Sequence, residues 1–280
     1  MKFTKMQGCG NDYVYVNCFK ETVPNPSEMA MKISNRNFGV GSDGLILICP
    51  SDVADVKMEM YNADGSQSQM CGNGIRCVGK YSYDYGIVNK NVITVETLAG
   101  IKTLQLEIEN NKVKRVTVDM GAPITIPALI PVKVEGDAVI SYPITVEETR
   151  YEITCVSMGN PHAITFVENT NDIGEIEVIG PKFEHHEVFP ERTNTEFIQI
   201  LNETEINMRV WERGSGETLA CGTGACASVY ACILNNKTKD EVTVHLLGGD
   251  LWIKYDRESG HIFMTGPAEV VFEGEIYNER

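Results

Sequence analysis

Two cysteines carry the pattern with the clearest chemical meaning in this sequence. Cys71 and Cys221 each precede a Gly-x-Gly triplet, and each stands at the start of a segment expected to be helical. A helix N-terminus presents unpaired backbone N–H groups and partial positive charge, which lower the pKa of a thiol and can bind a carboxylate. The glycines let a ligand approach the backbone closely. Each cysteine is therefore a candidate for proton transfer beside a carboxylate.

An internal repeat relates these two cysteines. Displaced by 150 residues, segment 56–61 (Val-Lys-Met-Glu-Met-Tyr) falls on 206–211 (Ile-Asn-Met-Arg-Val-Trp), and 70–74 falls on 220–224. If the two halves fold alike, a cleft between them receives one thiol from each side. One thiol then removes a proton from one face of a carbon and the other delivers a proton to the opposite face. The pair therefore indicates inversion at a carbon centre.

Polar residues near the repeated motifs suit a small zwitterionic ligand. Asparagine offers both donors and acceptors and can meet an ammonium or a carboxylate. In the Glu212-Arg213 pair, Arg can hold a carboxylate with two bonds while Glu takes an ammonium. His162 stands out among five histidines because it follows the Gly159-Asn160 dipeptide, which repeats Gly10-Asn11 at a displacement of 149. The asparagines in these turns are Asn11, Asn62, Asn160 and Asn194.

The other seven cysteines are expected in the core, because free Cys is among the most buried residue types. They are Cys9, Cys18, Cys49, Cys77, Cys155, Cys226 and Cys232. The sequence has no Cys-x-x-Cys pair, and the other spacings do not match zinc ligands, so no metal site is predicted.

The elements that must position these residues are mostly short strands. Helices are predicted at 72–85 and 222–234, with weaker signals at 27–35 and 176–186. Runs rich in Val, Ile, Leu and Thr, bounded by turn residues, predict strands. These runs are 44–49, 56–61, 92–96, 104–109, 113–119, 196–201, 206–211, 242–245, 251–255 and 269–272. The sequence thus predicts two similar α/β domains, joined by the Pro-rich segment 122–131, each with a strand leading to a Cys-headed helix.

Composition excludes several classes of protein. The 280 residues carry 24 Lys and Arg against 39 Asp and Glu, a net charge of −15, which argues against binding to nucleic acid or to an anionic membrane. We find no apolar run long enough to span a bilayer and no signal-peptide core. Nine cysteines, an odd number, are poor material for a disulfide framework. A soluble, reduced, cytoplasmic protein is expected.

The motifs together resemble the diaminopimelate epimerase family, whose members are cofactor-independent amino-acid epimerases. The resemblance extends over almost the whole chain in family order, and the two Cys motifs taken together make it specific. The matching motifs are 6–12 (Met-Gln-Gly-Cys-Gly-Asn-Asp), 62–66, 70–77 (Met-Cys-Gly-Asn-Gly-Ile-Arg-Cys), 158–162 (Met-Gly-Asn-Pro-His), 191–194, 211–215 and 220–225.

This resemblance implies an isomerase that interconverts LL- and meso-2,6-diaminopimelate in lysine and peptidoglycan-precursor biosynthesis. It implies a catalytic pair, Cys71 and Cys221, assisted by His162 and Glu212, with no cofactor and no metal. Some members carry Gln where this chain has Gly44, so that position is left out. The implied substrate contacts are Asn11, Asn62, Gly72, Asn73, Asn160, Asn194, Glu212, Arg213, Gly222 and Thr223.

The fold implied by the resemblance is α/β (α+β), with two pseudo-symmetric domains that each wrap a curved, mostly antiparallel sheet around a central helix. The chain's end returns to the first domain, so the expected domains are 1–121 with 267–280, and 122–266, with the active site in the cleft between them. The protein is expected to form homodimers.

Three other interpretations remain open. A racemase of the proline or hydroxyproline type shares the implied fold, but its ligands lack a distal amino-acid group and would leave Glu212 and Arg213 unused. A phenazine-type isomerase also shares the fold and has no need of the Cys pair. From a different class, the two thiols form a regulatory disulfide in a redox switch.

Overall fold

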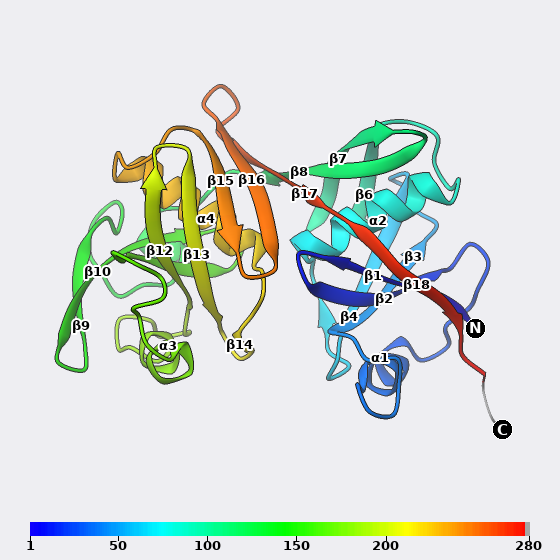
Figure 1. Cartoon of the computed structure of the whole chain (residues 1–280), viewed down its shortest axis with the longest axis horizontal. Helices are drawn as coiled ribbons and strands as arrows, with labels where there is room; N and C mark the ends of the chain where they lie inside the picture. Colours follow the sequence, from blue (N-terminus) through cyan, green and yellow to red (C-terminus); the bar gives the residue numbers. More distant parts are fainter. Residues whose placement is uncertain (278–280) are drawn as a thin grey trace. The chain divides into compact units, whose positions relative to one another are not determined.

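The computed structural model describes residues 1–277 and divides the chain into two compact units (Figure 1). The first unit comprises Met1–Asp119 together with the chain from Thr265 onward, and the second comprises Met120–Met264. Both units are mixed α/β structures dominated by strands, so the expected fold class is confirmed. No helix in residues 1–277 is long and apolar enough to cross a membrane.

The first unit forms a mostly antiparallel sheet. Strand β2 pairs in parallel with β3, and β4 pairs in parallel with β6, while the other pairs run antiparallel. In β4, Val56, Met58 and Met60 are buried and alternate with more exposed residues, as expected for a strand with one face on the core. The strands are β1 (Lys2–Gly8), β2 (Asn11–Asn17), β3 (Gly44–Cys49), β4 (Val56–Asn62), β5 (Gln67–Ser68), β6 (Val92–Thr97), β7 (Gly100–Glu109), β8 (Lys112–Gly121) and β18 (Glu269–Glu275).

The second unit repeats this topology. Strand β11 pairs in parallel with β12, β13 pairs in parallel with β15, and the intervening pairs are antiparallel, so β10–β16 follow the same order and directions as β1–β7. The expected duplication is therefore present in the strand pairing as well as in the sequence. The strands are β9 (Tyr142–Val146), β10 (Thr149–Ser157), β11 (Pro161–Phe166), β12 (Asn194–Asn202), β13 (Glu205–Glu212), β14 (Gly216–Glu217), β15 (Glu241–Leu246), β16 (Gly249–Asp256) and β17 (His261–Pro267).

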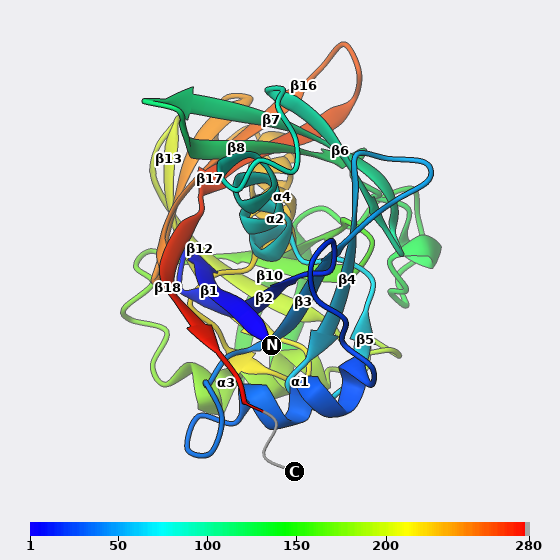
Figure 2. The ribbon, with the colours of Figure 1, turned by 90° about the vertical axis from the view of Figure 1, so that its right-hand side faces the viewer.

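Each sheet curves around one 13-residue helix, α2 (Gly72–Asp84) or α4 (Gly222–Leu234). Helix α2 contacts β1, β2, β3, β4, β6 and β7, and α4 contacts β10, β11, β12, β15 and β16. Figure 2 shows α2 among the strands of its unit. Most residues of both helices are buried, because strands cover them on several sides. The sheets therefore hold each helix, and the residue that begins it, in a fixed place.

Two shorter helices and one turn complete the fold. Helix α1 (Pro26–Ser34) contacts β2–β4, and α3 (Ile176–Glu184) contacts β12–β14. The segment interpreted as a connection, 122–131, contains the 3-10 helix η1 (Pro127–Leu129) and places Ile130 in the core of the second unit. This segment is therefore a packed part of that unit.

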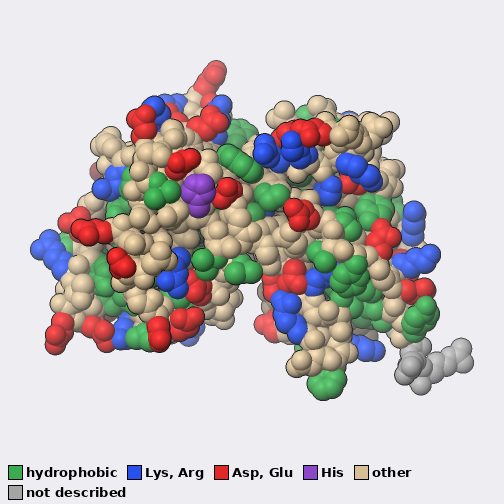
Figure 3. Space-filling view, viewed as in Figure 1, with side chains coloured by type: hydrophobic (Ala, Val, Ile, Leu, Met, Phe, Trp, Pro, Cys, Tyr) green, Lys and Arg blue, Asp and Glu red, His purple; other side chains and the backbone are tan. Residues whose placement is uncertain are grey.

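The four predicted helices are confirmed with bounds that differ by at most two residues, and all ten predicted strands coincide with observed ones. The strands that were not predicted are β1, β2, β5, β9, β10, β11, β14 and β17. On the face drawn in Figure 3, acidic and basic side chains are interspersed over each unit.

Candidate functional site

Cys71 is the N-cap residue of α2. Its backbone is extended (φ −130°, ψ 123°), and its Sγ accepts a hydrogen bond from the backbone N–H of Gly74 at 3.4 Å. A Cβ at position 74 would lie 2.7 Å from the Cδ1 of Ile46, so glycine permits the close fit of the helix start against β3. The thiol is only partly buried. The helix start therefore supplies a donor directly to the Cys71 sulfur.

Asn11, at the start of β2, contacts the same thiol. The Cys71 thiol donates to Asn11 Oδ1 at 3.3 Å, while Asn11 Nδ2 donates to Asp43 Oδ2 at 2.8 Å. Asp43 also accepts from the backbone N–H of Asp12 and pairs with Arg36. Burial raises the pKa of Asp43, and the hydrogen bonds from Asn11 and Asp12 together with the charge of Arg36 oppose this shift. Asp43 thereby turns the amide oxygen of Asn11 toward Cys71.

Cys221 is the N-cap residue of α4 and is 5% exposed. Its Sγ lies 3.5 Å from Thr223 Oγ1. The expectation that a helix N-terminus lowers the thiol pKa is wrong for Cys221. Burial raises its pKa well above the ordinary value, and the nearby carboxylates of Glu212 and Glu196 raise it further, which outweighs the bond from Thr223. Cys221 therefore rests as a protonated thiol.

A chain of side-chain contacts runs from Cys221 into the core of the second unit. Asn160 Nδ2 donates to Thr223 Oγ1 at 3.3 Å, and Asn160 Oδ1 lies 3.1 Å from His162 Nε2. On the other side of the ring, His162 Nδ1 lies 2.6 Å from Glu196 Oε1. His162 and Glu196 are both fully buried. Cys221, Thr223, Asn160 and His162 thus belong to one network.

A second group of predicted residues lies at the end of β13. Asn194 Oδ1 accepts from the backbone N–H of Arg213 at 2.8 Å, and Asn194 Nδ2 donates to Pro161 O at 2.9 Å. The guanidinium of Arg213 donates to Glu191 O at 2.8 Å. Glu212 Oε1 accepts from the hydroxyl of Thr218 at 2.6 Å. Asn194 therefore ties the Glu212-Arg213 pair to β11, the strand that contains His162.

The remaining predicted contacts lie at the two helix starts and at the end of β4. Gly72 and Asn73 are the first two residues of α2, as Gly222 and Thr223 are of α4. Asn62 ends β4 opposite Gly44, and its Nδ2 donates to Ser66 Oγ at 3.0 Å. A Cβ at position 44 would lie 2.2 Å from Tyr61 O, so no side chain fits there without a shift of the backbone.

The structure groups the predicted residues within each unit. In the first unit it joins Cys71 to Asn11 and leaves Asn62 bonded within its own turn. In the second unit it forms the Cys221 network and the Asn194–Arg213 group. Asp43 and Glu196 were not among the predicted residues. Glu196 could have been noticed because it is the one charged residue in the predicted strand 196–201. Asp43 lies in a polar turn, where a carboxylate is common.

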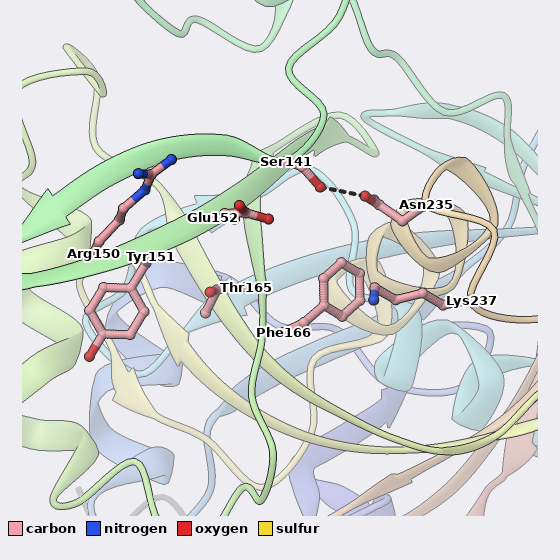
Figure 4. Close-up of a pocket in the computed structure, with 8 residues that line it drawn as sticks. All are labelled: Ser141, Arg150, Tyr151, Glu152, Thr165, Phe166, Asn235 and Lys237. Atoms are coloured by element: carbon pink, nitrogen blue, oxygen red, sulfur yellow. Dashed lines mark hydrogen bonds between the residues drawn. The ribbon is translucent and has the colours of Figure 1, made fainter.

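A cavity of about 540 Å³ in the second unit lies elsewhere (Figure 4). It borders Asn235, the C-cap of α4, whereas Cys221 is at the opposite end of that helix. Ser141 Oγ donates to Asn235 Oδ1 at 2.7 Å, and Lys237 Nζ lies 4.8 Å from the centre of the Phe166 ring. None of the eight residues drawn is a predicted site residue. Within residues 1–277, no group of three or more His, Cys, Asp or Glu side chains is arranged to hold a metal ion.

Comparison with known proteins identifies the family. The family model described as diaminopimelate epimerase matches residues 3–126 and 154–271. The chain belongs to the diaminopimelate epimerase family. The resemblance inferred from the motifs is thereby confirmed.

Relatives in this family match along nearly their whole length. A diaminopimelate epimerase of Acetivibrio thermocellus is 58% identical over 276 residues, covering 99% of this chain and 98% of its own. The diaminopimelate epimerase of Agathobacter rectalis is 59% identical over 99% of each chain, and that of Methanococcus maripaludis is 55% identical over 99% of each.

Solved structures with low sequence identity share the fold. A phenazine biosynthesis protein of Bacillus anthracis superposes with a TM-score of 0.70 at 20% identity, covering 99% of both chains. A probable proline racemase of Agrobacterium radiobacter superposes with a TM-score of 0.71 at 15% identity, covering 99% of this chain and 93% of its own. The diaminopimelate epimerase family thus shares its architecture with proteins of other named functions.

Proposed function

We propose that this protein is an isomerase that interconverts LL- and meso-2,6-diaminopimelate in lysine and peptidoglycan-precursor biosynthesis, and its relatives' name, diaminopimelate epimerase, supports this activity. The observation that carries the proposal is the matched pair of N-cap cysteines. Cys71 and Cys221 begin equal helices in two units of the same topology. An asparagine accompanies each helix start: Asn11, the first residue of β2, bonds to Cys71, and Asn160, which directly precedes β11, bonds to Thr223.

In the proposed mechanism the substrate binds in a cleft between the domains 1–121 with 267–280 and 122–266. Cys71 and Cys221 then face opposite sides of the α-carbon. One sulfur, as thiolate, takes the α-proton, and the other, as thiol, gives its proton to the far face. Which cysteine is the base depends on the direction of the reaction. No cofactor or metal takes part in this scheme.

The helix starts are proposed to bind the α-carboxylate of the reacting centre. Backbone N–H groups at Gly72-Asn73 and Gly222-Thr223 would donate hydrogen bonds to the carboxylate. These bonds would stabilise the negative charge that develops on it as the α-proton leaves. Both helix starts are buried on several sides by their sheets, so these donors are held in place before the substrate arrives.

The distal amino-acid group is proposed to bind through Glu212, Arg213 and the asparagines. Arg213 would hold the distal carboxylate, and Glu212 would meet an ammonium group. Asn194 supports this role because it fixes the backbone of Arg213. Asn62, at the equivalent strand end in the first unit, completes the set of polar contacts.

The protein is proposed to act on this small molecule in the cytoplasm as a homodimer, without binding nucleic acid or membranes. The net charge of −15 supports the last point. Strand β18 supports the dimer: all its residues except Gly274 are exposed, including Val271 and Phe272. Apolar side chains exposed on a strand are typical of a surface that a second copy covers. Sedimentation analysis of the purified protein checks this assembly.

The function is tested by incubating the purified protein with LL-diaminopimelate and separating the stereoisomers by chiral chromatography. We expect a mixture of LL and meso forms from either starting isomer. Parallel incubations with L-proline and trans-4-hydroxy-L-proline provide the control for substrate class. Racemisation of proline with diaminopimelate unchanged contradicts the proposal. Inertness toward all three substrates combined with a reversible Cys71–Cys221 disulfide favours the redox switch.

A further inference from the structure

The buried carboxylate of Glu196 has no equivalent in the first unit. Strand β12 pairs with β11 so that His162 lies opposite Asn194, and β3 pairs with β2 so that Tyr13 lies opposite Gly44. Two residues further along these strands stand Glu196 and Ile46. The second unit therefore has a carboxylate where the first has a hydrocarbon.

The helix beside Glu196 leaves room for this carboxylate. A Cβ at Gly224 would lie 2.6 Å from Glu196 Oε1, just as a Cβ at Gly74 would meet the Cδ1 of Ile46. Glu196 is 0% exposed, and its Oε2 has no hydrogen-bond partner among residues 1–277. A buried carboxyl group with an unsatisfied oxygen lowers the free energy of unfolding. A contribution to stability therefore does not explain the presence of Glu196, whereas its contact with His162 does.

The hydrogen bonds around His162 define where its protons are. Asn160 Nδ2 is the donor to Thr223 Oγ1, so the oxygen of that amide faces His162 Nε2, which must carry a hydrogen to bond with it. A further hydrogen lies in the 2.6 Å contact between His162 Nδ1 and Glu196 Oε1. The ring therefore keeps one hydrogen on Nε2 and shares another with Glu196 through Nδ1.

The surroundings favour this shared state. Burial raises the pKa of Glu196, and the contact with His162 only partly opposes that shift. The other titratable groups that face this carboxyl are Glu212, Cys155 and Cys221. These three groups are neutral or negative, so none of them stabilises an ionised Glu196.

We propose that Glu196 is a positioning residue: it fixes His162 with a hydrogen on Nε2, and His162 in turn fixes Asn160 and Thr223 against Cys221. This inference rests on the proposed function, since it takes Cys221 as one of the two proton carriers. Without Glu196 the ring can exchange its hydrogen between the two nitrogens and the amide of Asn160 can rotate. Thr223 then loses its fixed direction toward the sulfur.

The test compares two substitutions of similar length. Glu196→Gln can donate from its amide to Nδ1 and keep the hydrogen on Nε2, whereas Glu196→Met removes the hydrogen bond. We expect kcat to fall about 10- to 100-fold in the Met variant with KM little changed, and most of the turnover to be retained in the Gln variant. Equal turnover in the two variants overturns the proposal.

A spectroscopic measurement separates this claim from the proposed function. In protein labelled with ¹⁵N-histidine, correlation spectra report which ring nitrogen of His162 carries hydrogen, whether or not the protein epimerises diaminopimelate. We expect protonated Nε2 in the wild type and in the Gln variant, and a smaller protonated fraction in the Met variant. An unprotonated Nε2 in the wild type overturns the proposal.

Glu184→Met is the matched structural control. Glu184 is another buried carboxylate of the second unit, and it accepts from Trp211 Nε1 at 2.7 Å rather than from His162. Its loss should lower the melting temperature while leaving the ¹⁵N shifts of His162 unchanged. A change in those shifts as large as in Glu196→Met assigns the effect to general loosening of the unit and contradicts the positioning role.

Discussion

The two units hold their N-cap cysteines on the same backbone frame and surround them with different side chains. In the first unit the thiol bonds to an asparagine whose amide is turned by a partly exposed aspartate, Asp43. In the second, the matching asparagine is turned by a buried imidazole and carboxyl pair. The residues at matched strand positions, with the first unit named first, are Tyr13 and His162, Gly44 and Asn194, and Ile46 and Glu196.

This difference indicates which features of the duplicated site are required in both halves. The cysteine cap, the Gly-x-Gly triplet and the asparagine recur, because each half needs a thiol held at a helix start. The side chains that contact these asparagines differ between the units. The residue after the end of β4 or β13 differs as well, since Ala63 in the first unit corresponds to Arg213 in the second. The proton-transfer chemistry is therefore symmetric in the proposal, while ligand recognition and thiol positioning are not.

Removing either N-cap thiol is expected to have the largest effect on turnover. Cys71→Ala and Cys221→Ala should each lower epimerase turnover by at least about 10³-fold, because each removes one of two proton carriers. Steady-state kinetics with LL-diaminopimelate measures the effect. Cys232→Ala, a buried cysteine near the other end of α4, is the control and should retain turnover. Near-normal activity in either N-cap variant means that one thiol suffices.

The next effect concerns the residue that only the second unit has. Arg213→Lys should raise KM about tenfold and change kcat less, because an ammonium group cannot hold a carboxylate with two parallel bonds. Arg257 forms a two-bond contact with Asp240 on the surface, so Arg257→Lys provides a matched control with unaltered KM. An unchanged KM in Arg213→Lys shows that the guanidinium serves only to bind Glu191.

A smaller effect is expected at the aspartate of the first unit. In Asp43→Asn the acceptor for Asn11 Nδ2 becomes an amide that can rotate, so the oxygen of Asn11 is no longer fixed toward Cys71. We expect kcat to fall up to about tenfold. Glu59→Gln, which loses an ion pair with Lys57 on the same sheet, is the control. If both variants keep full turnover, Asp43 has no part in orienting Asn11.

Most of the differences between the two units could not be predicted from the sequence. The cysteine helices were predicted because their small and apolar residues have clear helical spacing and no proline interrupts them. Strands β1 and β2 are separated only by Cys9-Gly10, and β10 and β11 only by residues 158–160, so these turn residues masked the strand signal. The network around Cys221 joins residues from three separate elements, and only the parallel pairing of β11 with β12 brings His162 and Glu196 together.

The error about the Cys221 pKa has the same origin. The position of a cysteine at a helix start can be read from the sequence, but its burial cannot. Since desolvation disfavours a thiolate, the sheet that encloses α4 outweighs the favourable helix end. Burial was also misjudged for two of the seven cysteines expected in the core, because Cys18 and Cys49 are only partly buried.

A separate prediction concerns stability at high pH rather than turnover. Burial raises the pKa of the Cys77 thiol to about 11 and that of Cys232 to about 12, while an unfolded thiol titrates near 8.5. Below pH 8.5 the thiols are protonated in both states. Above it only the unfolded state loses protons, so stability falls by up to about 3 kcal/mol per thiol at pH 10.5. Melting temperatures from pH 8 to 10.5 measure this fall, which should be shallower in Cys232→Ala; an equal slope contradicts the assignment.

The central claim, two thiols that act on opposite faces of one carbon, is tested most directly by epimerisation in deuterated water. A thiol carries one proton, so the sulfur that removes the α-hydrogen is not the one that delivers the new deuteron. Early in the reaction, the newly formed isomer should carry deuterium at the inverted carbon while the unreacted substrate stays protiated, from either starting isomer. Product that retains the original hydrogen, or early deuterium in recovered substrate, contradicts the pairing of Cys71 with Cys221.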